Sequence, residues 1–224
     1  METIVPVEAV ALVRPRLRGV LHQAFLPAFV AAAVVLIVLA GSPLGRMAMA
    51  SYGVGLAGCL GTSALYHRGR WSPLTRALLG RIDHSMIFLL VAGTYTPVCL
   101  LALRGTMGYV VLGIVWIGGA LGAAMAMLWP RAPVWAEVAP YILVGWSAVL
   151  AFPQLATGLG WGGLSLLMVG GLLYTAGAII YGLERPDPFP SVFGYHEIFH
   201  ALVVLAAAAH CVAVYVWILP RSWG

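Results

Sequence analysis

The sequence predicts an all-α integral membrane protein, a bundle of seven transmembrane helices with its N-terminus in the cytoplasm. Three observations support this prediction. Hydrophobic residues make up 62% of the 224-residue chain and charged residues only 8%, whereas soluble domains carry roughly 25% charge. The mean hydropathy is +0.98. The apolar residues form seven runs of about 20 residues, the length that crosses a bilayer.

The first four runs are separated by short polar connections. The first begins after Arg14, Arg16 and Arg18 and is too long for the apolar part of a signal peptide, so we expect it to remain as a membrane span. A glycine-proline turn, a basic loop and an Arg-Gly pair then separate the runs, and two prolines end the fourth. The predicted spans are about 19–39, 46–66, 83–103 and 107–129.

The last three runs are predicted at about 134–155, 164–183 and 194–219. A glycine-rich turn separates the first two, and a polar, proline-rich loop precedes the last. Residues 1–18 would then form a cytoplasmic segment, residues 19–219 the seven-helix domain, and residues 220–224 a short extracytoplasmic tail. The three cysteines lie within apolar runs, so we expect them to be buried and free.

The positions of the arginines predict the orientation. The chain has a formal charge of +5, and all twelve basic residues are arginines at or near the ends of apolar runs. This placement indicates membrane orientation and does not favour a nucleic-acid partner. With the N-terminus inside, nine arginines are cytoplasmic and three are external (Arg46, Arg104 and Arg221). The excess of positive charge on the inner side favours this orientation and puts the C-terminus outside.

This topology brings five of the six histidines to one depth near the cytoplasmic face: His22, His67, His84, His196 and His200. His210 lies deeper in the last span. Ionisable groups inside a membrane are costly and usually mark a functional site. Asp83, at the predicted start of the third span, lies at the same depth.

The histidine spacing is suited to a metal ion. His196 and His200 are four residues apart, so they share one face of a helix. With His67 they offer three nitrogen ligands, and a water in the fourth position would complete a tetrahedral Zn²⁺ site. Ser63 lies one turn from His67, and Asp83 could hold the water or act as a general base. The alternative is a hydrogen-bonded cluster that seals the helix ends.

The run from His196 to His200 also fits the H-E-x-x-H pattern of zinc proteases, in which the glutamate is the general base. The flanking signatures of those proteases are absent from the sequence. This interpretation is therefore the weaker one.

Three segments resemble motifs of the hemolysin III family, which belongs to the progestin and adipoQ receptor superfamily. They are Ser63-Ala-Leu-Tyr-His67, the run from Asp83 to Pro97, and Gly194-Tyr-His-Glu-Ile-Phe-His200. The resemblance implies Zn²⁺ held by His67, His196 and His200, with Asp83 at the zinc-bound water and Ser63 in the same constellation. It also implies a cytoplasmic N-terminus. The stretch before His22 departs from the family pattern, so we expect His22 to be interfacial.

The superfamily includes receptors and alkaline ceramidases, so the resemblance implies a zinc-dependent hydrolase of a lipid amide in the plasma membrane. Its partners would be membrane lipids and a lipid amide substrate. Two alternatives remain open: a receptor or regulator of membrane homeostasis with a structural zinc site, and a proton or ion pathway. A lytic pore is disfavoured because no polar stripe runs through several spans.

Overall fold

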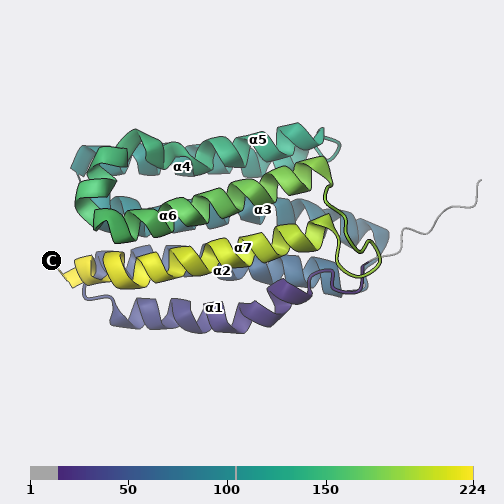
Figure 1. Ribbon diagram of the computed structural model, residues 1–224, viewed down its shortest axis with the longest axis horizontal. Coiled ribbons are helices and arrows are strands. Elements are labelled where there is room, and N and C mark those ends of the chain that lie inside the picture. The colour runs from purple at the N-terminus through teal and green to yellow at the C-terminus, as the bar shows by residue number, and fades with distance from the viewer. Residues whose placement is uncertain (1–14, 104, 224) are drawn as a thin grey trace, which may run out of the picture.

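The computed structural model describes residues 15–103 and 105–223. Residues 1–14, with Arg14, and also Arg104 and Gly224 lie outside the described residues. The helices run nearly parallel to the long axis of the molecule and form one elongated bundle (Figure 1). Its α-helices are α1 (Val20–Leu39), α2 (Pro43–Arg68), α3 (Pro73–Pro97), α4 (Gly105–Leu128), α5 (Val134–Gly145), α6 (Phe152–Leu183) and α7 (Tyr195–Ala213).

Short helices of other types extend or join these elements. The π-helix η1 (Val98–Leu103) follows α3 directly after Pro97, which has no N–H to continue the α-helical pattern. The 3-10 helix η2 (Ser147–Ala151) joins α5 to α6. After α7 the chain continues through the π-helix η3 (Val214–Ile218) and the 3-10 helix η4 (Leu219–Trp223).

Within residues 15–103 and 105–223, six helical stretches are long and apolar enough to cross a membrane. This confirms the prediction of an all-helical membrane protein. The fifth stretch, Val134–Leu183, contains α5, η2 and α6 and is 50 residues long. Its helical pattern is interrupted at Gly160, which has a φ of +65°. Figure 1 shows the chain turning between α5 and α6 at the end of the bundle where the C-terminus lies.

Helix α3 begins ten residues earlier than the predicted third span. Ser72 caps it by accepting a hydrogen bond from Thr75 N at 3.2 Å, and Pro73 occupies the first turn, where no N–H is needed. The basic segment after His67 was therefore wrongly predicted to be a long loop, because Arg76 and Arg81 lie on α3. The early start also places Asp83 inside the bundle and not at a helix end.

Helices α2 and α3 approach each other through glycines. A Cβ built on Gly93 would lie 2.7 Å from the carbonyl oxygen of Ser51, and one built on Gly55 would lie 2.7 Å from that of Leu89. Backbone atoms cannot rotate away as a side chain would. These glycines therefore allow the contact between the two helices that carry His67 and Asp83.

Gly93→Ala should lower the thermal stability of the protein in detergent, by about 1–3 kcal/mol, because the new methyl group pushes α2 and α3 apart. Gly113→Ala on α4 is the control, since no described atom lies within 4 Å of its built Cβ. It should leave stability equal or raise it by up to about 1 kcal/mol. Similar melting temperatures for the two variants would show that the α2–α3 contact tolerates a methyl group.

Candidate metal centre

Three histidines from two helices meet at one end of the bundle. His67 is next to the last residue of α2, and His196 and His200 lie in the first two turns of α7. One ligand atom from each lies within 4.8 Å of the others, and this is the group in the described part of the chain that could hold a metal ion. The prediction that these three side chains converge is confirmed.

The spacing of the nitrogens fits a metal ion. The Nε2 atoms of His67 and His196 are 3.2 Å apart. Two nitrogens bound tetrahedrally to one zinc ion at about 2.0–2.1 Å would be about 3.3 Å apart. The ring centroid of His200 lies 4.6 Å from that of His196 and 5.1 Å from that of His67. The residues present therefore fit three-nitrogen coordination of Zn²⁺, with all three ligand atoms within 4.8 Å of one another.

A carboxylate and a hydroxyl complete the surroundings of the three histidines. Oδ2 of Asp83 lies 3.5 Å from Nε2 of His67, the same nitrogen that faces His196. Ser63, one turn before His67 on α2, is 2% exposed, and its hydroxyl has no hydrogen-bond partner among the described residues. Asp83 is thus close enough to form a hydrogen bond with a water held between the histidines. The Ser63 hydroxyl is available to form a hydrogen bond with a ligand.

His22 is buried beside these histidines, although an interfacial side chain was expected to be exposed. Its side chain is 2% exposed, and its ring stacks on that of His200 with centroids 4.0 Å apart and planes 20° apart. Helix α1 packs against α7 as well as α2, which carries His22 inward. The sequence signal was the position of His22 at the same depth as the other histidines.

Glu197 faces away from the three histidines. Its Oε2 accepts a hydrogen bond from Gly194 N at 2.8 Å, and its Oε1 forms an ion pair with Arg18. The carboxylate therefore caps the start of α7 and ties it to the segment that precedes α1. Because both oxygens are engaged in this way, the protease interpretation lacks its general base.

Arg18→Gln should lower the stability of the protein by about 3 kcal/mol, because the partner carboxylate of Glu197 is 1% exposed and would remain buried without its counter-charge. Thermal unfolding in detergent measures the effect. Arg16→Gln is the matched control, since Arg16 is exposed and its described contact is made by its backbone N–H to Ser191 O. Equal melting temperatures for the two variants would contradict a stabilising role for the buried pair.

A second polar contact joins α3, α5 and α6 beside the three histidines. Nδ1 of His84 lies 3.3 Å from Oε2 of Glu137, and its Nε2 lies 3.4 Å from the hydroxyl of Tyr181. The ring of Tyr181 in turn contacts His196, with centroids 5.5 Å apart. Neither Glu137 nor Tyr181 was predicted from the sequence to be a functional residue. The available signal was a lone glutamate within an apolar helix.

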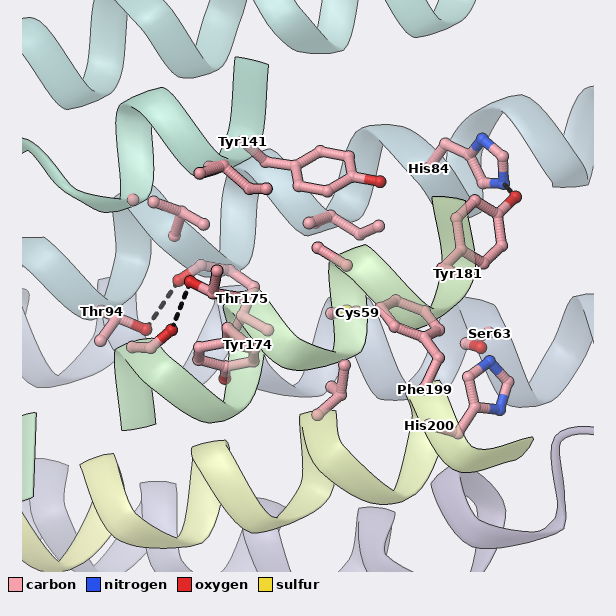
Figure 2. Close-up of a pocket in the computed structure, with 18 of the residues that line it drawn as sticks. Cys59, Ser63, His84, Thr94, Tyr141, Tyr174, Thr175, Tyr181, Phe199 and His200 are labelled. Atoms are coloured by element: carbon pink, nitrogen blue, oxygen red, sulfur yellow. Dashed lines mark hydrogen bonds between the residues drawn. The ribbon is translucent and has the colours of Figure 1, made fainter. Parts of the chain in front are cut away.

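A largely apolar cavity extends from these residues into the bundle. Its lining includes His22, Ser63 and Asp83 near the three histidines. It also includes His210, which follows His200 by ten residues on α7. Ten residues of α-helix span about 15 Å. Figure 2 shows Ser63, His84 and His200 toward one end and Thr94 at the other, with Tyr174 and Thr175 near Thr94. His210 Nε2 lies 3.1 Å from the carbonyl oxygen of Leu167. The centre thus forms the polar end of a long apolar space.

Comparison with known proteins identifies the family. A family model described as haemolysin-III related matches residues 10–211. Hemolysin-3 of Bacillus cereus is 34% identical over 194 residues, which is 85% of each chain. A hemolysin-3 homolog of Bacillus subtilis is 36% identical over 143 residues, 63% of this chain and 64% of the relative. Human monocyte to macrophage differentiation factor is 26% identical over 168 residues, 73% of this chain and 67% of the relative. The chain is therefore a multi-pass membrane protein that belongs to the haemolysin III family, within the progestin and adipoQ receptor superfamily.

Proposed function

We propose that this protein is a zinc-dependent hydrolase that cleaves the amide bond of a membrane lipid. The observation that carries the proposal is a group of three imidazoles beside a carboxylate, with His196, His200, Asp83 and Ser63 lining an apolar cavity. The Ser63 hydroxyl has no hydrogen-bond partner among the described residues. Each of these groups has a distinct part in amide hydrolysis.

The three imidazoles would hold the metal ion, and the chain would supply the remaining groups. A zinc ion with three protein ligands and an open position polarises a carbonyl and lowers the pKa of bound water to roughly 7. Asp83 would accept the proton of the attacking water and pass it to the leaving amine. Ser63 would donate its free hydroxyl to the carbonyl oxygen as negative charge develops there.

The cavity supports a lipid as the substrate. It offers a lining that includes Ile87, Leu90 and Val203 beyond the polar end, and this lining would hold an acyl chain with its carbonyl carbon at the histidines. The amide bond of such a lipid already lies in the bilayer, so the substrate could enter without passing through water.

The proposed setting is the plasma membrane, with seven spans and the N-terminus and metal centre on the cytoplasmic side. The arginine distribution supports the orientation. The interruption at Gly160 supports two crossings within Val134–Leu183, since residues 134–159 and 161–183 both exceed the ~20 needed for one span.

The test is a hydrolysis assay on detergent-purified protein loaded with zinc. A panel of N-acyl amides, including an N-acyl sphingoid base, should yield free fatty acid, and chelation of the metal should stop the release. Full zinc occupancy without release of fatty acid from any member of the panel would refute the hydrolase.

A structural zinc site is the competing function. His67 belongs to α2 and the other two histidines to α7, so one ion would fasten two helices distant in sequence. This arrangement would suit a receptor or regulator. A structural ion predicts that Asp83→Asn leaves function intact, whereas loss of the histidines lowers the melting temperature.

A further inference from the structure

His22 is a buried histidine whose ring nitrogens lack a hydrogen-bond partner in the part of the chain that the structure describes. It is 2% exposed, and neither Nδ1 nor Nε2 has a partner in hydrogen-bond geometry among the described residues. The backbone of His200 lies near the His22 ring, but it is not in hydrogen-bond geometry with either ring nitrogen. Leaving buried polar atoms unpaired costs about 1–3 kcal/mol each. Such atoms in a folded protein call for a partner supplied from elsewhere.

The position of His22 indicates where that partner binds. The ring lines the cavity together with Ser63 and Asp83. It stacks nearly parallel to the ring of His200. The ring of His22 therefore lies next to the group formed by His67, His196 and His200. His22 itself is not part of that group of three.

The hydroxyl of Ser63 lines the same cavity as His22. The hydroxyl of Ser63, on a different helix from His22, is likewise buried without a partner in the described chain. Two polar side chains from α1 and α2, each without a hydrogen-bond partner among the described residues, therefore line one cavity. An apolar ligand whose head group carries a hydrogen-bond acceptor would satisfy both.

We propose that His22 contacts the ligand directly, donating a ring N–H to the carbonyl oxygen of an acyl group that lies in the cavity. This inference rests on the proposed function for the acyl ligand, but it concerns binding and needs no turnover. The stack on His200 fixes the plane of the ring, and the absence of another partner keeps the N–H free until the ligand arrives. In amide cleavage the same donor would stabilise the oxyanion.

His22→Phe tests the inference because it keeps a ring to stack on His200 and removes both nitrogens. Three quantities are measured on purified protein: zinc per chain, melting temperature, and affinity for palmitic acid by displacement of a fluorescent fatty acid. The variant should keep its zinc and melt at the wild-type temperature or above, because it no longer buries unpaired nitrogens. Its Kd for palmitic acid should rise about tenfold.

His210→Phe is the matched control, a second buried histidine that lines the same cavity about 15 Å away along α7. Its Kd for palmitic acid should stay within about threefold of wild type. If His22→Phe fails to fold, His22→Leu takes its place, since it also lacks a donor and its Kd should rise by a similar factor. His22→Gln, whose amide keeps a donor, should preserve most of the affinity.

Three results would overturn the role of His22: unchanged palmitic acid binding in His22→Phe, loss of its zinc, or a fall in melting temperature that accounts for weaker binding. Wild-type protein that does not bind palmitic acid would also overturn it. Protein that binds palmitic acid through His22 yet hydrolyses no amide would remove the hydrolase and leave this inference standing.

Discussion

Asp83→Asn is expected to lower the rate of lipid amide hydrolysis by about 10²–10⁴-fold while zinc per chain stays at the wild-type level. The carboxylate lies 3.5 Å from Nε2 of His67 and would be the base that takes the proton of the attacking water. Asparagine has the same shape but cannot accept that proton. Turnover of an N-acyl amide and metal content measured on the same preparation check the prediction.

Asp187→Asn is the control for Asp83→Asn. Asp187 is exposed and accepts a hydrogen bond from Tyr195 N at 3.1 Å, which an asparagine oxygen can also accept. Its turnover should equal that of wild type. An Asp83→Asn variant that retains full activity would exclude a general-base role, and one that loses its zinc would make Asp83 a part of the metal site.

Gly171→Leu is expected to make the proposed hydrolysis selective for short acyl chains. Gly171 on α6 lines the cavity, and no described atom lies within 4 Å of a Cβ built there, so a leucine would enter open space without displacing backbone. The leucine would occupy the space that the far end of a long chain needs, so a long chain could no longer enter fully. The kcat/KM for a hexadecanoyl amide should therefore fall at least about tenfold, whereas that for a butanoyl amide should remain unchanged.

Gly113→Leu provides the comparison for Gly171→Leu. Gly113 lies on α4 outside the cavity lining and also has open space beside it in the described structure. The Gly113→Leu substitution should leave the kcat/KM for both amides unchanged. Equal loss of the long and short amides in Gly171→Leu would mean that the acyl chain does not lie along α6.

The sequence was sufficient to predict the helical membrane fold and most helix positions, because long apolar runs leave few alternatives in a bilayer. It was less informative at the ends of helices. The arginines of the α2–α3 connection suggested a loop, but Ser72 and Pro73 begin α3 before them. The interruption at Gly160 lay within the predicted glycine-rich turn, since a positive φ is favourable only for glycine.

The convergence of His67, His196 and His200 was also predictable, because helical spacing and common depth place them together. The partners of the neighbouring groups were not. Nothing local indicates that Glu197 pairs with Arg18, which lies 179 residues away. The inward position of His22 depends on how α1 rotates against α7, and that rotation is determined by packing of the whole bundle.

Both proposed functions require that His67, His196 and His200 hold zinc. The most direct test is the metal content of detergent-purified protein, measured by plasma mass spectrometry beside a His196→Ala/His200→Ala variant. We expect about one zinc per wild-type chain and none in the variant, since three imidazoles and one open position would form the site. Well-folded wild-type protein that contains no metal, even after incubation with zinc, would contradict both the hydrolase and the structural zinc site.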